Sequence, residues 1–212
     1  SLILKMLYWG NFIMVLVLYS KFTKSVIEYN IEILKKYPEI KIAINLSPSD
    51  IFDESIIYIL KEINKELRNR IILEIVETED IHSYDLFIDN VVKLKKEYGY
   101  KICIDDFGAG YSNFTHLLKI NTDYLKFDGS IIKNIHKDKI SYDLAETITS
   151  FCKKMNIKTV AEYVENNQIL EKVRELNIDY GQGFLFYKAM PIEEAVKLIK
   201  DEDQEYEENI FE

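Results

Sequence analysis

The sequence contains few of the residues that build disulfide frameworks or imidazole-rich centres. Its 212 residues include two cysteines, Cys103 and Cys152, and three scattered histidines. Two cysteines cannot form a disulfide framework, so we expect reduced thiols in a cytoplasmic protein. Three histidines far apart in the chain argue against a zinc site made of imidazoles alone. The content of 48% hydrophobic and 30% charged residues excludes a disordered or collagen-like chain.

Basic residues are outnumbered by acidic ones. The net charge is 27 − 36 = −9, and no cluster of basic residues stands out. We therefore expect no binding of long nucleic acid through its backbone. Residues 201–212 hold seven acids and no base, which leaves −9 + 7 = −2 for the rest of the chain. We interpret this segment as a solvated acidic tail.

Residues 1–20 form an atypical apolar segment. Fifteen of them are apolar or aromatic, and Lys5 carries the only charge. A membrane-spanning helix needs about 20 predominantly apolar residues, and Gly10 and Asn11 interrupt this run. We interpret the segment as a pair of buried strands, with a membrane-proximal segment and an anomaly of the sequence as alternatives. Because the chain begins at Ser1, we expect a fragment or a processed chain.

From residue 22 onward, strand-like and helix-like patterns alternate. Helical spacing predicts helices near residues 51–67, 84–98 and 144–155, and Pro191 is expected to open the last helix. Short apolar runs predict buried parallel strands at residues 41–46, 71–76, 102–106, 124–128, 159–164 and 183–186. This order indicates a single α/β domain, either a barrel or a doubly wound sheet.

Polar side chains stand at the ends of these apolar runs. They are Asn45, Glu74, Glu77, Asp105, Asp106, Lys126, Asp128, Glu162, Glu165 and Gln182. In a parallel barrel the carboxyl ends of all strands meet on one face, so these residues are expected to converge there.

The chemistry of this set is rich in oxygen ligands. Carboxylate and amide oxygens suit Mg²⁺ or Mn²⁺, whereas zinc usually recruits histidine or cysteine. The adjacent Asp105 and Asp106 would let one carboxylate bridge two ions while its neighbour binds one. Two ions about 3.5–4 Å apart suit in-line displacement at a phosphodiester. The glycines at positions 108 and 110 would allow close approach of the backbone.

These segments together resemble the EAL-domain family over about residues 21–191. The motifs, in the family's order and spacing, are Asn45-Leu46-Ser47, Leu73-Glu74-Ile75-Val76-Glu77, Asp105-Asp106-Phe107-Gly108-Ala109-Gly110-Tyr111-Ser112, Leu125-Lys126-Phe127-Asp128, Val160-Ala161-Glu162-Tyr163-Val164-Glu165 and Gln182-Gly183-Phe184-Leu185-Phe186. Members of the family linearise cyclic di-GMP to pGpG with two Mg²⁺ or Mn²⁺ ions. The resemblance implies a modified TIM (β/α)8 barrel over residues 21–200, incomplete or altered at the first strand, which in the family runs antiparallel to the rest.

The resemblance also implies roles for individual residues. Asn45, Glu74 and Asp105 would hold one ion, and Asp105, Asp106 and Glu162 would hold the other. Lys126 would orient or deprotonate the attacking water, with Asp128 beside it.

Further roles concern a loop and the substrate side. Glu77 resembles the glutamate that anchors the loop at residues 107–112, which in the family couples metal occupancy to dimerisation. The loop positions of interest are Phe107, Gly108, Gly110 and Ser112. Glu165 and Gln182 resemble positions behind the metal ligands and beside the substrate. For Glu77, Asp128 and Glu165, a structural salt bridge fits equally well.

The chain departs from the family pattern at its start. No Glu-Ala-Leu occurs, and no acid precedes Glu28. The family's glutamate there is a metal ligand, and an arginine just after it contacts the substrate phosphate. Tyr163 also stands where the family has glycine, and Gly129 where it has arginine. We therefore expect weaker metal binding at Asn45, Glu74 and Asp105, and slower turnover.

The favoured function is hydrolysis of cyclic di-GMP by a two-metal site. The alternative is an impaired EAL domain that acts as a cyclic di-GMP receptor or a protein-interaction module, and a different metal-dependent phosphatase barrel is a third hypothesis. We expect a homodimer in the cytoplasm. A sensor or membrane anchor upstream of this chain is compatible with the resemblance, which would make the chain the cytoplasmic domain of a membrane-attached protein.

Overall fold

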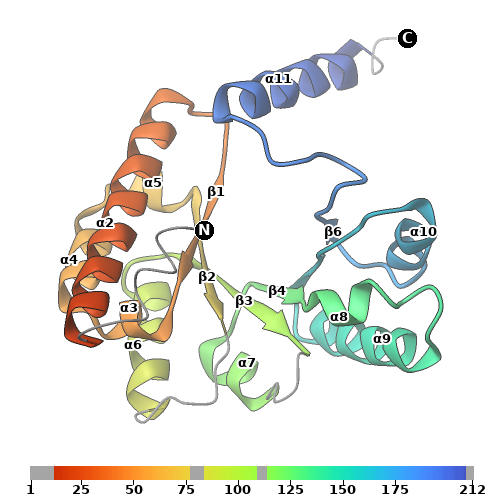
Figure 1. Ribbon diagram of the computed structural model, residues 1–212, viewed down its shortest axis with the longest axis horizontal. Coiled ribbons are helices and arrows are strands. Elements are labelled where there is room, and N and C mark those ends of the chain that lie inside the picture. The colour runs from red at the N-terminus through yellow and green to blue at the C-terminus, as the bar shows by residue number, and fades with distance from the viewer. Residues whose placement is uncertain (1–11, 77–83, 109–113, 209–212) are drawn as a thin grey trace.

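The computed structural model describes residues 12–76, 84–108 and 114–208, without the side chains of residues 12–18, 116 and 201–208. Its centre is a six-stranded parallel sheet in which every strand pairs with the next one in sequence (Figure 1). The strands are β1 (Ile42–Leu46), β2 (Ile71–Val76), β3 (Lys101–Phe107), β4 (Tyr124–Phe127), β5 (Lys158–Ala161) and β6 (Tyr180–Gly181). The described strands do not close on themselves, so they form an incomplete barrel with β1 and β6 at its edges.

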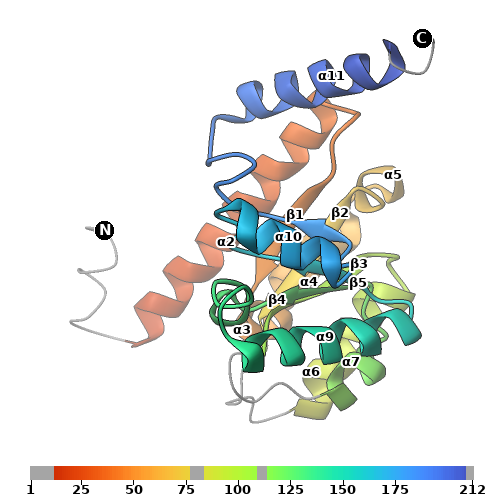
Figure 2. The same cartoon turned by 90° about the vertical axis from the view of Figure 1, so that its right-hand side faces the viewer.

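Helices connect the strands and cover the outer face of the sheet. They are α2 (Phe12–Lys36), α3 (Pro48–Phe52), α4 (Glu54–Glu62), α5 (Lys65–Arg68), α6 (Tyr84–Lys96), α7 (Phe114–Ile120), α8 (Gly129–Ile132), α9 (Lys139–Lys154), α10 (Asn167–Glu175) and α11 (Ile192–Glu208). Figures 1 and 2 both place α11 beside the connection from α2 to β1. Ion pairs of Lys36 with Glu193 and of Lys200 with Glu39 hold it there.

The prediction of a strand pair near the N-terminus is wrong for residues 12–20, which belong to helix α2. The apolar octet at residues 12–19 continues into a helical pattern, since Thr23, Ile27 and Leu34 are buried on one side of α2. A run of 25 residues without proline or glycine favours a helix over two short strands. No helix within the described ranges is long and apolar enough to cross a membrane.

Two other predicted elements differ in the structure. The single helix near residues 51–67 is divided into α3, α4 and α5, because Asp53 and Asn64 cap new helices with their side chains. The last predicted strand, at residues 183–186, is a turn closed by the amide of Phe186 on the carbonyl of Gly183, and β6 lies earlier. The division into residues 1–20, 21–200 and 201–212 stays a prediction. Helix α2 runs through the first of these boundaries, and helix α11 runs through the second.

The sheet register determines which side chains face the inside of the incomplete barrel. Along β2, Ile71, Leu73 and Ile75 are buried beneath the helices, so Glu74 faces the opposite, inner side. Asn45 pairs in register with Glu74, and Val76 with Asp105. Alternation along parallel strands therefore brings the polar side chains of several strands to one side of the sheet.

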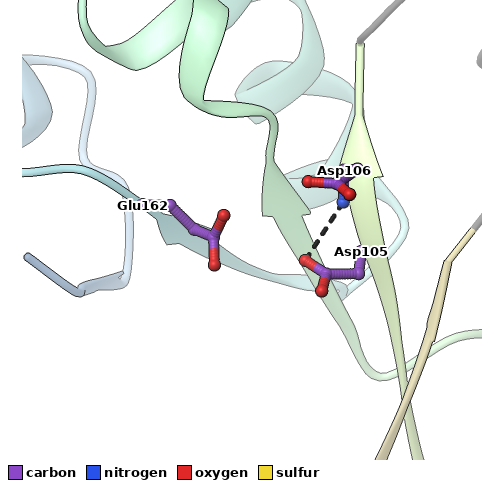
Figure 3. Close-up of side chains that lie close together, drawn as sticks. All are labelled: Asp105, Asp106 and Glu162. Atoms are coloured by element: carbon purple, nitrogen blue, oxygen red, sulfur yellow. Dashed lines mark hydrogen bonds between the residues drawn. The ribbon is translucent and has the colours of Figure 1, made fainter. Parts of the chain in front are cut away.

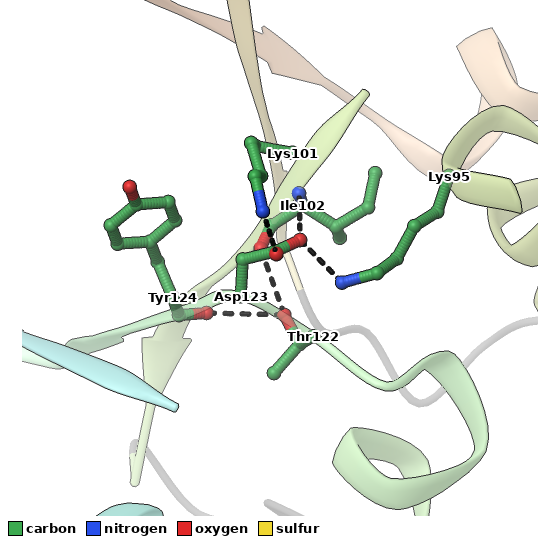
Figure 4. A network of polar contacts seen from close by, with 6 residues as sticks. All are labelled: Lys95, Lys101, Ile102, Thr122, Asp123 and Tyr124. Atoms are coloured by element: carbon green, nitrogen blue, oxygen red, sulfur yellow. Dashed lines mark hydrogen bonds and ion pairs between the residues drawn. The ribbon is translucent and has the colours of Figure 1, made fainter. Parts of the chain in front are cut away.

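Asp123 joins the start of β3 to the start of β4. The Asp123 carboxylate, just before β4, accepts hydrogen bonds from the Lys95 and Lys101 ammonium groups and from the amide of Ile102 (Figure 4). Burial opposes the charged form, but the bonds from Lys101 and Lys95 outweigh it and hold the pKa of Asp123 below the ordinary 3.8. This carboxylate therefore fixes the start of β3 against β4.

We expect Asp123→Asn to lower the free energy of unfolding by about 1.5–3 kcal/mol at neutral pH, the usual effect of losing hydrogen bonds to a charged group. Because the folded pKa is depressed, this contribution is present above the unfolded value and is lost as the pH falls through the folded value. Urea unfolding from pH 7 to pH 3 should therefore show a difference from the native protein that shrinks at the acid end. The control is Asp143→Asn, which removes an exposed pair with Lys139 and should change stability by less than about 1 kcal/mol. A loss for Asp123→Asn no larger than the control's would contradict the prediction.

Candidate metal centre

Lys126 lies at the centre of a group of carboxylates on the inner side of the sheet. It comes from β4, and only 5% of its surface is exposed. Its Nζ atom lies 2.7 Å from Glu162 Oε1, 3.2 Å from Asp105 Oδ1 and 3.3 Å from Glu74 Oε2. The three carboxylates come from β2, from β3 and from the residue that follows β5. The structure thus brings together Lys126, Glu74, Asp105 and Glu162, which the sequence analysis predicted to converge from the ends of four strands.

Three acidic residues lie close enough together to hold a metal ion. Asp105 and Asp106 come from β3, and Glu162 approaches from the end of β5 (Figure 3). One ligand atom from each lies within 4.8 Å of the others. The Asp106 amide donates a 3.0 Å hydrogen bond to Asp105 Oδ1, in a left-handed backbone conformation that aspartate tolerates (φ 54°). An oxygen-only set of this size fits a hard divalent cation such as Mg²⁺ or Mn²⁺.

The electrostatics of the group follow from burial and crowding. Burial, joined by the charges of Asp105 and Glu162, raises the pKa of Glu74 although Lys126 opposes this. Burial likewise raises the pKa of Asp106, with Asp105 and then Asp128 adding to the effect. For Lys126, burial favours the neutral amine, but the hydrogen bond to Glu162 and the charges of Glu74 and Asp105 outweigh it and raise the pKa. The three carboxylates of the metal-free group therefore favour the ammonium form of Lys126.

Asn45 stands next to Glu74 but at the edge of the sheet. The two residues are register partners on β1 and β2, and Asn45 is exposed. Among the described residues, no strand pairs with the other side of β1. The amide of Asn45 is thus open to solvent on the side where the incomplete barrel ends. Its role as a metal ligand stays a prediction.

Asp128 caps helix α8. Its side chain accepts hydrogen bonds from the amide and the hydroxyl of Ser130, and its own amide donates to the carbonyl of Phe107. Its charge nevertheless acts on Asp106, since it contributes to the raised pKa there. Asp128 therefore has a helix-capping role, while the expected structural salt bridge and a part in handling water both stay predictions.

The predicted substrate-side and loop residues fall into three groups. Glu165 and Gln182 line a pocket of about 230 Å³ together with Glu162. Phe107 is buried against Phe114, and a side chain at Gly108 would collide with Ile131, so both have packing roles. The remaining predicted residues, Glu77, Gly110 and Ser112, lie outside the described residues.

Two aromatic residues of this pocket were not predicted as site residues. Tyr163 follows Glu162, and Phe184 follows Gly183; both line the pocket and both are exposed. The sequence carried no direct signal for Tyr163, because successive side chains of an extended strand point to opposite faces, and the left-handed backbone of Tyr163 (φ 55°) breaks this alternation.

Comparison with known proteins identifies similar chains. The family model of the EAL domain matches residues 11–189. The cyclic di-GMP phosphodiesterase PdeA of Borreliella burgdorferi is 35% identical over 153 residues, covering 71% of this chain and 23% of that protein. The cyclic di-GMP phosphodiesterase PdeF of Escherichia coli is 33% identical over 183 residues, covering 82% of this chain and 24% of that protein. The chain therefore spans about a quarter of the length of these relatives.

Solved structures show the same fold. BlrP1 of Klebsiella pneumoniae, in a complex with manganese and cyclic di-GMP, matches with a TM-score of 0.68 at 27% identity, over 78% of this chain and 44% of that one. The EAL domain of Mycobacterium smegmatis DcpA matches with a TM-score of 0.71 at 24% identity, over 77% of this chain and 74% of that one.

Proposed function

The chain belongs to the EAL domain family, and from this premise we propose that it hydrolyses cyclic di-GMP to linear pGpG in the cytoplasm, using two Mg²⁺ or Mn²⁺ ions. The observation that carries the proposal is the position of Lys126 Nζ within 3.3 Å of Glu74, Asp105 and Glu162. The similarity to curated cyclic di-GMP phosphodiesterases supports the choice of substrate. The cytoplasmic location is supported by two free, buried cysteines.

The acidic residues divide into two overlapping ligand sets. Asp105, Asp106 and Glu162 would hold one ion, and Asn45, Glu74 and Asp105 would hold the other. The bound ions would supply a nucleophilic hydroxide and neutralise charge on the phosphodiester. A site of this composition favours harder cations such as Mg²⁺ or Mn²⁺ over zinc, which usually recruits histidine or thiolate ligands.

Lys126 supplies a positive charge beside three carboxylates that would otherwise repel one another. When ions take up these carboxylates, the three N–H donors of its ammonium group would be available to orient a water or a phosphate oxygen. Orientation of the attacking water and proton transfer from it are both kept as proposed roles of Lys126. Asp128 keeps the start of α8 in place beside Asp106.

The first experiment is chromatography of the purified protein after incubation with cyclic di-GMP and Mn²⁺. We expect linear pGpG, which should disappear when a chelator is added, because the chelator removes the divalent ions that the proposed hydrolysis requires. Asn45→Ala should raise the Mn²⁺ concentration needed for half-maximal rate if the exposed amide is a ligand. Absence of pGpG at high Mn²⁺, together with measurable binding of cyclic di-GMP, would replace hydrolysis by the receptor function.

A homodimer and an upstream sensor stay predictions. Sedimentation of the purified chain with and without Mn²⁺ tests the first of them directly.

A further inference from the structure

Tyr163 has an unusual backbone conformation. Its φ angle is +55°, in the left-handed region. The other described non-glycine residues with positive φ are Asp106, Asn121, Asn156 and Asn177, which are the residue types that tolerate this region. A bulky aromatic residue there is an outlier, and such outliers cluster at functional sites. Tyr163 also lies directly beside Glu162, in the candidate metal centre.

The ring of Tyr163 is held in place from outside the pocket. A Cβ atom at Gly129 would come within 2.4 Å of the ring atom Cδ2, so the ring rests on bare backbone at the start of α8. The Lys133 ammonium lies 3.7 Å from the ring centroid, a close cation–π contact. The side chain is thus fixed although 45% of Tyr163 is exposed. Its position depends on position 129 carrying no side chain.

A second aromatic residue lines the same pocket. The backbone of Gly183 lies so close to Val164 that a Cβ atom would come within 2.3 Å of the Val164 carbonyl oxygen. Hydrogen bonds from the Val164 amide to the Gln182 carbonyl and from the Leu185 amide to the Val164 carbonyl join the same two segments. Phe184 is therefore placed beside the pocket by backbone contacts. The polar residues of the lining are Glu162, Glu165 and Gln182.

We propose that Tyr163 forms the wall of a nucleobase subsite, on which a guanine base of the substrate stacks beside Glu162. This rests on the proposed function. The pocket volume of about 230 Å³ is smaller than the roughly 300–1,000 Å³ of sites that enclose a whole ligand, so it suits one base. Aromatic walls provide stacking, while the Glu165 carboxylate and the Gln182 amide match the donors and acceptors on a guanine edge.

The test compares two ligands that share a ribose 5-phosphate unit, of which one carries the guanine base. We would measure by NMR the binding of 5′-GMP and of ribose 5-phosphate to the full chain at saturating Mg²⁺. Tyr163→Gly is expected to weaken 5′-GMP binding about tenfold, because stacking of one base has an effect of this order. Binding of ribose 5-phosphate should not change. Tyr163→Phe keeps the ring and should bind 5′-GMP like the native protein.

Gly129→Ala should displace the Tyr163 ring, because the new Cβ atom would collide with it, while the residues that line the pocket stay unchanged. It should weaken 5′-GMP binding, and the double variant Gly129→Ala/Tyr163→Gly should bind no more weakly than Tyr163→Gly alone. Tyr58→Ala, at an exposed tyrosine of α4, is the control for unspecific effects and should leave both affinities unchanged. Native binding of 5′-GMP by Tyr163→Gly would overturn the proposal, as would equal affinity of the native protein for the two ligands.

The subsite and the proposed function can fail separately. Base-dependent binding without any formation of pGpG would support the subsite and refute hydrolysis. Formation of pGpG with no dependence of binding on the base or on Tyr163 would refute the subsite and leave hydrolysis intact.

Discussion

Glu162→Gln is expected to reduce metal-dependent hydrolysis of cyclic di-GMP by at least about 10²-fold, the usual effect of losing one preorganised electrostatic contact. Glu162 belongs to the ligand cluster with Asp105 and Asp106, and its Oε1 atom also lies 2.7 Å from Lys126 Nζ. Glutamine keeps the shape of the side chain but removes the charge that both the cation and Lys126 require. One substitution thus weakens two interactions of the same group.

The measurement is the rate of pGpG formation over a range of Mn²⁺ concentrations, with circular dichroism and thermal unfolding as a check of folding. Glu171→Gln is the matched control, because Glu171 is an exposed residue of α10 away from the cluster. Asp105→Asn should behave like Glu162→Gln. Turnover of Glu162→Gln equal to that of the control, in a folded protein, would remove Glu162 from the proposed ligand set.

Lys126→Met is expected to destabilise the metal-free protein by about 3–5 kcal/mol, the range found when one partner of a buried ion pair is removed. The ammonium is the shared partner of Glu74, Asp105 and Glu162, whose side chains are 11–14% exposed. Without it these carboxylates repel one another in a poorly hydrated space. Protonation relieves that repulsion, so the loss should be largest at neutral pH and smaller near pH 5.

Divalent cations should reverse much of this loss. A cation that binds only the folded state adds stability according to its concentration and affinity. In Lys126→Met it would also replace the missing positive charge. Urea unfolding in chelator and in Mn²⁺ should therefore show a larger stabilisation by Mn²⁺ in the variant than in the native protein. Lys139→Met, at an exposed lysine paired with Asp143, is the control and should change stability by less than about 1 kcal/mol. Equal stability of Lys126→Met and the native protein in chelator would contradict the assignment of Lys126 as the central counter-charge.

The candidate site was predictable because parallel strands place their ends together. Glu74, Asp105 and Lys126 lie within short apolar runs of the kind typical of buried strands, and Glu162 follows such a run directly. The resemblance to the EAL family, confirmed by the match over residues 11–189, rested on the same segments. Short-range patterns were thus sufficient to identify the group that converges on Lys126.

Other features depended on contacts between segments far apart in the sequence. The turn at residues 183–186 resembles a strand in composition, but the close approach of Gly183 to Val164 bends the chain there. The apolar octet at residues 12–19 resembles a strand as well, but it is the beginning of a 25-residue helix packed on β1 and α4. Composition alone does not distinguish a strand from a helix or a turn in these segments. A short apolar segment that is buried on one side fits the 3.6-residue period of a helix as well as the two-residue period of a strand.

The sequence by itself determined the α/β architecture, the family and the carboxylates that meet at the ends of the strands. These follow from hydrophobic periodicity and from the side chains that interrupt it, both of which are local. The tertiary structure decided that Lys126 pairs with three carboxylates, that Asp128 caps a helix, and that Tyr163 rests on Gly129 beside Glu162. Those relations depend on strand register and on backbone contacts across the sheet, and a one-residue change of register would turn strand side chains such as Glu74, Asp105 and Lys126 to the other face.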